Sequence, residues 1–109
     1  MKTFKVKYHY FSHEREAERD ITLIFFAENA EKVNSLADNW ASARGWTKLS
    51  IEPTEKTNYK QCEAIINQET GERCFRQALH THNDREICNI HNWHFEHNPE
   101  FAEHITFVS

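Results

Sequence analysis

The first ten residues alternate between apolar and polar side chains, which predicts a half-buried β-strand. The apolar face holds Phe4, Val6, Tyr8 and Tyr10. Residues 12–19 are mostly charged and indicate an exposed turn or the end of a hairpin. Residues 20–27 (DITLIFFA) are apolar on both faces, which is typical of a strand that is covered on both sides.

Apolar residues then recur with the 3.6-residue period of a helix that buries one face. This stripe consists of Val33, Leu36, Ala37, Trp40 and Ala41. Asn29 is suited to cap the start of the helix, and Gly45 is suited to end it in the left-handed conformation. Alternation resumes over residues 46–52 and stops at Pro53. The first half therefore predicts a β-β-α-β layer, in which one helix covers one face of an antiparallel or mixed sheet.

The second half predicts a hairpin followed by a helix. Residues 62–74 contain Thr70-Gly71, a turn signal that would bring the two ends of this segment together. Residues 84–97 are expected to form a helix that begins at Asp84 and ends before Asn98-Pro99.

Residues 104–108 (HITFV) are expected to form a last strand at the edge of the sheet. A chain of 109 residues is long enough for one domain, or for one small domain with a satellite. We therefore predict the fold class α+β, with three parts: a β-β-α-β domain (1–58), a metal-binding module (59–98), and a C-terminal tail or edge strand (99–109).

The composition indicates the cellular compartment in which we expect this chain. No apolar run approaches the roughly 20 residues that a membrane-spanning helix needs. The N-terminus, MKTFKVKYHY, lacks the apolar stretch of a signal peptide. The chain has 3 cysteines, an odd number that cannot all pair within one molecule. We therefore expect a cytoplasmic protein whose reduced cysteines can act as thiolate ligands.

Three cysteines and one histidine have the spacing C-x11-C-x13-C-x2-H. These residues are Cys62, Cys74, Cys88 and His91. Three thiolates and an imidazole can close a tetrahedral shell around Zn²⁺. On the predicted helix, Cys88 and His91 stand three residues apart and therefore lie on one face. A shell of four protein ligands leaves no open position for water, so we predict a structural zinc ion.

Other interpretations of these residues are open. The cysteines could be three buried free thiols beside a surface histidine, because free cysteine is common in protein cores. His80 or His82 could replace one of the four predicted ligands. His94 and His97 follow His91 along the helix and could form a second, weak metal site with Glu96 or Glu100, or simply a solvated face.

The segment from Gln61 to His91 also carries a resemblance. The residues QCEAI, TGERCFRQAL and ICNIH resemble the small C-x-A…G-x-x-C…C-x-x-H fingers of short bacterial and phage proteins. They also resemble the plant WRC zinc-finger domain, which has the same ligand order. The resemblance implies that Cys62, Cys74, Cys88 and His91 bind zinc and that Gly71 and Ala78 are structural. This chain differs from those fingers in its slightly longer spacers and in having acidic residues where they are commonly basic.

The charge pattern favours a protein partner over a nucleic acid. Residues 60–91 hold 4 basic and 5 acidic side chains, and residues 92–109 hold 3 acidic and no basic ones. Neither segment is a basic surface for phosphates. We predict a non-enzymatic binding module with these candidate contact residues: Phe11, Trp93, Phe95, Arg73 and Arg76. The alternative is a nucleic-acid-binding regulator that uses Lys5, Lys7, Arg73, Arg76 and Arg85.

A third hypothesis is a metal-dependent nuclease. The sequence CNIHNWH is similar to the end of HNH nuclease motifs, and His80, His82 and Asn92 would have to supply the catalytic roles. The residue pair that starts that motif is not visible between the first two cysteines, and the chain has no Gly-rich phosphate loop. A small β-β-α-β layer joined to a finger instead resembles accessory proteins of phages and mobile elements, which implies binding to a host enzyme.

Overall fold

The structure is a computed structural model that describes residues 2–55 and 58–108. The chain folds into two compact units, unit 1 (Met1–Thr57) and unit 2 (Asn58–Ser109). Both contain antiparallel strands and helices, so the predicted α+β fold class is confirmed.

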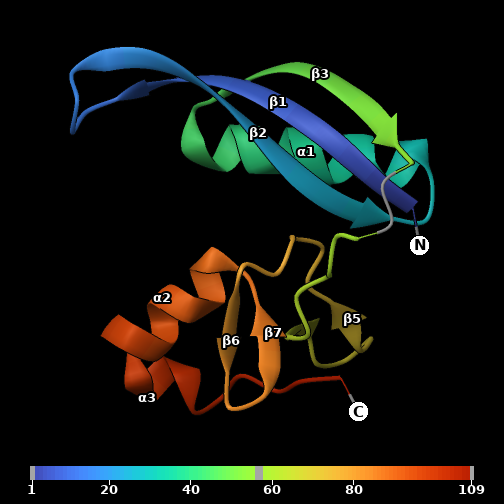
Figure 1. The fold of residues 1–109 in the computed structure, drawn as a ribbon, viewed down its shortest axis with the longest axis vertical. Helices are drawn as coiled ribbons and strands as arrows, with labels where there is room; N and C mark the ends of the chain where they lie inside the picture. The colour runs from blue at the N-terminus through green and yellow to red at the C-terminus, as the bar shows by residue number, and fades with distance from the viewer. Residues whose placement is uncertain (1, 56–57, 109) are drawn as a thin grey trace. The chain divides into compact units, whose positions relative to one another are not determined.

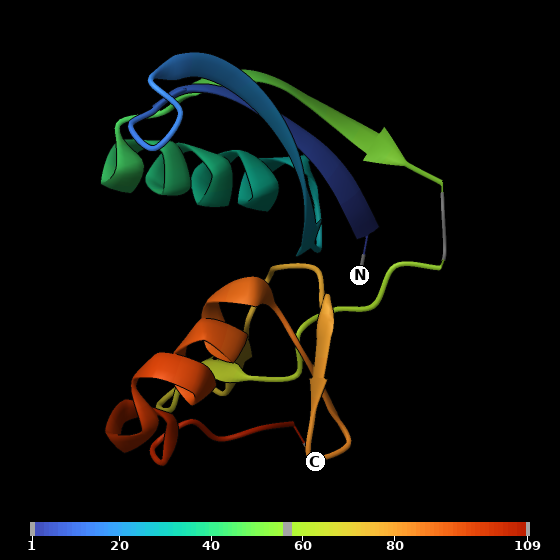
Figure 2. The ribbon, with the colours of Figure 1, turned by 60° about the vertical axis from the view of Figure 1, so that its left-hand side comes forward.

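Unit 1 has the predicted order β-β-α-β. Its elements are β1 (Lys2–Ser12), β2 (Ala17–Ala27), α1 (Ala30–Arg44) and β3 (Thr47–Thr54). The sheet is antiparallel, with the strand order β2-β1-β3, and α1 lies along one of its faces (Figures 1 and 2). β3 pairs with β1 at the edge of the three-stranded sheet, so Pro53, which has no N–H to donate, is tolerated within it.

The ends of α1 follow the predicted capping. The side-chain oxygen of Asn29 accepts a hydrogen bond from the backbone N–H of Lys32, at 2.8 Å. Gly45 adopts the left-handed conformation with φ of 70° and donates its N–H to the carbonyl of Ala41. The buried residues of α1 all belong to the predicted stripe: Val33, Ala37, Trp40 and Ala41.

Aromatic side chains form the core between the sheet and α1. On the apolar face of β1, Phe4, Val6 and Tyr8 are buried, as the alternation predicts, whereas Tyr10 is half-buried. Tyr8 is completely inaccessible. The phenol of Tyr8 donates a hydrogen bond to the carbonyl oxygen of Ala37 at 2.8 Å, which satisfies its polar end. Phe25 packs edge-on against Trp40 with 5.8 Å between the ring centroids. β2 begins earlier than predicted, because its charged residues from Ala17 onward pair with the end of β1.

Unit 2 is built from short elements. They are β4 (Ile65–Asn67), β5 (Glu72–Arg73), β6 (His80–His82), β7 (Arg85–Ile87), α2 (Asn89–His97) and α3 (Pro99–Ala102). The predicted hairpin around Thr70-Gly71 is present as β4-β5. β6 and β7 form a second antiparallel hairpin, which the sequence pattern did not indicate.

The predicted start of the second helix is wrong. Asn83 and Asp84 have φ of 48° and 65°, and they form the two-residue turn between β6 and β7. Tight hairpins favour positive φ at both central residues, and asparagine and aspartate tolerate it. The helix therefore begins at Asn89, with Cys88 as its N-cap, and ends at His97 as predicted.

The C-terminal segment pairs within unit 2. Phe107 forms an isolated antiparallel bridge with Ala64. The N–H of Ile65 donates to the carbonyl of Thr106, and the N–H of Val108 donates to the carbonyl of Glu63. The expected last strand is thus an edge segment beside β4, and the three-stranded sheet of unit 1 does not include it.

The cysteines lie at the centre of the unit 2 core. The fully or nearly fully buried members of this core are Cys62, Ala64, Cys74, Ile87 and Cys88. Four partly buried residues pack around them: Ile90, Phe95, Ile105 and Phe107. Among the described residues, no helix is long and apolar enough to cross a membrane.

Candidate metal centre

Backbone pairing brings Cys62 and Cys74 together. The N–H of Cys62 donates to the carbonyl of Arg76 at 2.9 Å, and the N–H of Cys74 donates to the carbonyl of Ala64 at 2.8 Å. The two cysteines therefore lie on neighbouring antiparallel segments, on either side of the β4-β5 turn. Both side chains are buried, with exposed fractions of 0% and 3%.

Asn67 and Gly71 shape the turn that closes this hairpin. The side-chain oxygen of Asn67 accepts hydrogen bonds from the N–H groups of Glu69 and Thr70, at 3.0 and 3.3 Å. Its carbonyl accepts from the N–H of Gly71 at 2.8 Å. Gly71 has φ of 72°, a conformation that side chains disfavour, so the structural role that the family resemblance implies for Gly71 has a physical basis here.

The start of α2 positions the other two ligands. Cys88 is the N-cap residue, and His91 follows in the first turn. Both side chains point to the same side of the helix, with Sγ of Cys88 lying 3.1 Å from Nδ1 of His91. A helix N-terminus carries a partial positive charge, which favours the thiolate form of Cys88.

Glu63 ties the hairpin to the segment that precedes α2. Its N–H donates to the carbonyl of Glu86 at 2.9 Å, and its carboxylate accepts from the N–H of Glu86 at 2.6 Å. Arg85 contacts the same carboxylate at 3.4 Å. The hydrogen bond with the Glu86 backbone is the main cause of a lowered pKa at Glu63, and Arg85 adds to it. This clamp holds Cys62 close to Cys88.

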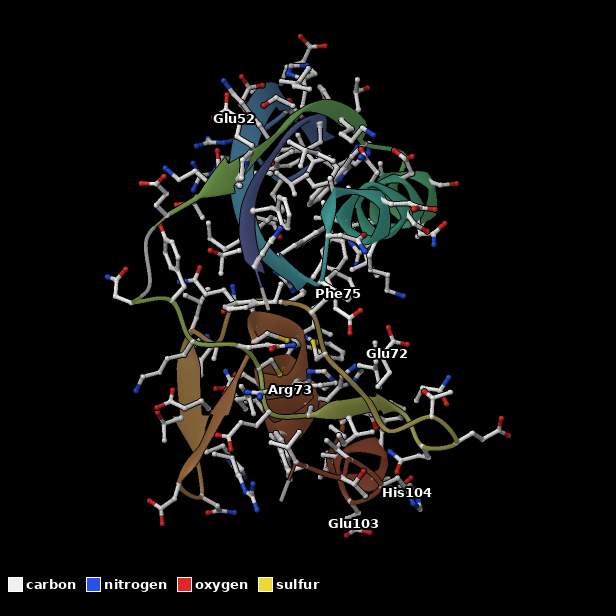
Figure 3. The ribbon with its side chains drawn as sticks, turned by 90° about the vertical axis from the view of Figure 1, so that its right-hand side faces the viewer. Glu52, Glu72, Arg73, Phe75, Glu103 and His104 are labelled. Atoms are coloured by element: carbon white, nitrogen blue, oxygen red, sulfur yellow. The ribbon has the colours of Figure 1, made fainter. Side chains whose placement is uncertain are left out.

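The four predicted ligands form one cluster. The three Sγ atoms and one ring nitrogen of His91 all lie within 4.8 Å of one another. Cys74 and Cys88 have their sulfurs 4.0 Å apart, and Sγ of Cys62 lies 3.4 Å from the imidazole nitrogen. A tetrahedral zinc ion needs ligand atoms about 3.6–3.8 Å apart, given bonds of about 2.3 Å to sulfur and about 2.0 Å to nitrogen. The cluster therefore fits a tetrahedral ion, and Figure 3 shows its yellow sulfur atoms gathered in unit 2.

The electrostatics of the cluster favour a bound cation. Hydrogen bonds with Cys62 and Cys74 lower the pKa of the Cys88 thiol, although burial opposes this. Hydrogen bonds with Cys62 and Cys88 raise the pKa of the Cys74 thiol, and burial raises it further. One buried thiolate therefore suppresses ionisation of the next. Burial lowers the pKa of His91, but hydrogen bonds with the sulfurs of Cys62 and Cys88 outweigh it and raise the pKa to about 9. A divalent ion would supply the positive charge that three thiolates need.

Arg73 and Gln61 support the backbone around the ligands. The guanidinium of Arg73 donates to the carbonyl oxygens of Cys62 and Gln61, at 2.7 and 2.8 Å. The side-chain amide of Gln61 donates to the carbonyl of Cys74 at 2.8 Å. Figure 3 shows Arg73 reaching into unit 2 from β5. Such outer contacts orient metal ligands, and nothing in the spacing of the cysteines predicted them.

The alternative histidine ligands lie outside the cluster. Nε2 of His80 is 2.6 Å from the side-chain oxygen of Asn89, and the ring of His82 stacks on Phe95 with 4.1 Å between centroids. In the part of the chain that the structure describes, no second group of three or more potential ligands is found, so a metal site at His94 and His97 is not supported.

The predicted contact residues differ in accessibility. Phe11 and Trp93 are exposed to 50% and 51%. Phe95 instead packs on the core of unit 2. Arg76 is only 9% exposed, and the guanidinium of Arg73 is engaged by backbone carbonyls. Arg73 and Arg76 therefore already have structural contacts or burial within unit 2, and their part in a contact surface stays a prediction.

Comparisons with protein-family models, with curated protein sequences and with solved structures find no match for this chain. The ligand set and the surface of the molecule are therefore the basis for assigning a function.

Proposed function

We propose that this chain is a non-enzymatic binding module that a structural zinc ion stabilises, and that its partner is another protein. The observation that carries the proposal is the cluster of three sulfurs and one imidazole nitrogen within 4.8 Å. The order Cys, Cys, Cys, His supports a small finger of the kind found in short bacterial and phage proteins and in the WRC domain.

The donor set supports zinc in particular. Three thiolates and an imidazole are soft and borderline ligands, which suit zinc far better than magnesium or calcium. Zinc also accepts tetrahedral geometry without a cost from d-electrons. Because the site has four protein ligands, an ion bound there has no open position for water or substrate. Burial of all three cysteines supports a structural role in the same way.

The surface charge supports a protein partner. Residues 58–109 hold 4 basic and 8 acidic side chains. The four basic ones are engaged or buried: Lys60 pairs with Glu86, Arg85 with Glu63, Arg73 with backbone carbonyls, and Arg76 is in the interior. Unit 2 thus offers little free positive charge to a phosphate backbone, which makes the nucleic-acid alternative weaker.

Metal analysis of the full chain tests the first part of the proposal. Protein purified without chelator should contain one zinc ion per chain by elemental analysis. Replacement by Co²⁺ should give the intense visible absorption of a tetrahedral thiolate site. His91→Ala should lower the metal affinity, whereas His80→Ala should leave it unchanged. A chain without stoichiometric metal would refute the proposal.

Capture experiments test the second part. In a pull-down from cells that naturally produce this chain, the zinc-loaded chain should retain a specific protein. The Cys88→Ser variant should not retain it. Gel-shift assays with DNA and RNA should show no salt-sensitive complex. Incubation with plasmid DNA and Mg²⁺ or Mn²⁺ should show no cleavage. A sequence-dependent complex with nucleic acid, or cleavage that His80→Ala abolishes, would replace the protein-binding function with one of the two alternatives.

A further inference from the structure

Four rings form a continuous surface on α2 and α3. Trp93 stacks on His97 with 5.0 Å between centroids and meets His94 edge-on at 5.2 Å. His94 in turn lies 4.4 Å from Phe101 of α3. We call these four residues the α2–α3 aromatic patch. The two helices lie next to each other in Figures 1 and 2.

The patch leaves its two largest rings in solvent. Trp93 is 51% exposed and Phe101 is 50% exposed, although both belong to helices whose other faces pack on the unit. Exposed aromatic rings that lie side by side are typical of interaction sites, because tryptophan supplies a large contact area at low cost in side-chain entropy. The core of unit 2 does not need these rings, since it is built from other residues.

Three carboxylates lie on the same two helices as the patch. Glu96 follows on α2, Glu100 lies in α3, and Glu103 caps the end of α3. Glu103 projects from the lower edge of unit 2 as drawn in Figure 3. All three are exposed, and within residues 2–55 and 58–108 none of them forms an ion pair. No lysine or arginine occurs after Arg85.

Exposed aromatic rings and carboxylates on the same helices indicate what kind of partner the patch would bind. An aromatic face attracts a cation, and the attraction is strongest for tryptophan and for arginine as its partner. The three carboxylates on these helices add to the attraction for a cation and repel phosphates. A nucleic acid, whose bases could stack on Trp93 and Phe101, would bring its backbone against three negative charges. A second copy placed symmetrically would oppose the same three carboxylates.

We propose that the α2–α3 aromatic patch binds an arginine-rich, extended segment of a protein partner, with guanidinium groups over Trp93 and Phe101 and paired with the carboxylates. The proposal rests on the zinc-stabilised binding function and names the chemistry of its partner. It places recognition on the helices that follow the metal ligands.

A model peptide tests this directly. The probe is a fluorescein-labelled 12-residue peptide that alternates arginine and serine, added to the zinc-loaded full chain and followed by fluorescence anisotropy. The same peptide with glutamate in place of arginine and a (dT)12 oligonucleotide are the comparison ligands. The arginine peptide should bind, and the other two should not.

Matched variants distinguish binding at the patch from nonspecific attraction between the peptide and the net negative charge of the chain. Trp93→Ala should weaken binding about two- to fivefold, whereas Leu79→Ala, at a residue of unit 2 that is 55% exposed, should not. The triple variant Glu96→Gln, Glu100→Gln, Glu103→Gln should weaken binding about tenfold. The control triple variant Glu14→Gln, Glu31→Gln, Glu55→Gln removes the same charge from unit 1 and should have little effect. Zinc content of each variant confirms that unit 2 is intact.

Four results would overturn the inference. Equal weakening by both triple variants would mean that only net charge matters. Tighter binding of the oligonucleotide, lost in Trp93→Ala, would make the patch a nucleic-acid surface. Self-association that Trp93→Ala abolishes would make the occupant a second copy. A chain that holds one zinc ion but fails to bind the peptide refutes this inference alone, whereas a chain without zinc refutes the proposed function.

Discussion

Sγ of Cys88 lies 3.1 Å from Nδ1 of His91, one helical turn further along α2. The N-cap position leaves the Cys88 backbone extended, with φ of −78° and ψ of 170°, and allows its sulfur to face the helix that it begins. Nδ1, the ring nitrogen nearer to the backbone, is therefore the expected metal ligand. The site is compact enough that a shorter ligand side chain could serve at position 91.

The first prediction concerns this ligand. His91→Cys should keep one bound metal ion, because a fourth thiolate completes a tetrahedral site of another common type. His91→Ala should weaken metal binding. Competition with a chromophoric zinc chelator measures both affinities. Equal loss in the two variants would argue that His91 supports the site through its ring contacts and not as a ligand.

Removal of the metal should unfold unit 2 before unit 1. Three buried thiols and an imidazole would lose the ion that they share, and the three cysteines make up most of the fully buried core of this unit. Amide NMR spectra after addition of a strong chelator should lose the dispersed signals of residues 58–108 and keep those of the β2-β1-β3 sheet. Added zinc should restore them. Unit 2 signals that persist without metal would show that its apolar core is sufficient.

Trp40 is predicted to be the main anchor of α1. It is 8% exposed, packs against Phe25, and lies under the guanidinium of Arg44, 3.3 Å from the ring centroid. Trp40→Ala should lower the free energy of unfolding of unit 1 by about 3–5 kcal/mol. Trp93→Ala, in unit 2, is the control and should lower the free energy of unfolding of unit 2 by under about 1 kcal/mol, since half of that ring is in solvent. Urea titrations followed by the amide signals of each unit measure the two changes.

A substitution in the β6-β7 turn should change the stability of unit 2 in a direction that tests the turn. Asp84 has φ of 65°, where glycine is the least strained residue. Asp84→Gly creates the Asn-Gly pair that two-residue hairpins prefer and should raise the stability of unit 2 by about 0.5 kcal/mol. Thermal unfolding of the zinc-loaded variant measures this change. A fall in stability would instead support the helix cap that the sequence suggested.

Tyr8 should make unit 1 sensitive to alkaline pH. Burial, with a contribution from the carboxylate of Asp38, raises the pKa of Tyr8 from 10 to about 12, although Arg44 opposes the rise. A folded-state pKa above the unfolded value means that the stabilisation is complete below pH 10 and is lost as the pH rises towards 12. The loss should reach about 2–3 kcal/mol.

The Tyr8→Phe variant separates the stability lost through ionisation of Tyr8 from the stability lost through titration of lysines. The variant should be less stable near pH 8 by about 1 kcal/mol, because the bond to the Ala37 carbonyl is gone. Between pH 10 and 12 it should lose less stability than the natural chain. Parallel loss in both proteins would show that folding does not raise the pKa of Tyr8.

The sequence predicts best where local periodicity decides the structure. The β-β-α-β order of unit 1, the cap at Asn29 and the left-handed Gly45 follow from patterns within a few residues. The cluster of three cysteines and one histidine was also predictable, because thiols and imidazoles have few other reasons to share such a spacing. Each of these features depends on side chains that are neighbours along the chain or have a distinct chemistry.

The rest depends on pairing between distant or polar segments. Asp84 suits both a helix cap and a tight turn, and only the pairing of β6 with β7 decides between them. The bridge from Phe107 to Ala64 joins residues far apart in the sequence. Arg73 and Arg76 have the charge of surface residues, yet the fold draws them inward. No local pattern distinguishes such arginines from ones that stay in solvent.

Cys88 has two roles, and together they would make partner binding depend on the supply of zinc. Cys88 would coordinate the ion, and it is also the N-cap residue of α2. The orientation of that helix would therefore depend on the bound ion. On the proposed function, a cell starved of zinc would still synthesise the chain but could not present Trp93 and Phe101 in a fixed arrangement. Partner engagement would then rise and fall with the supply of a trace element, without any change in the amount of protein.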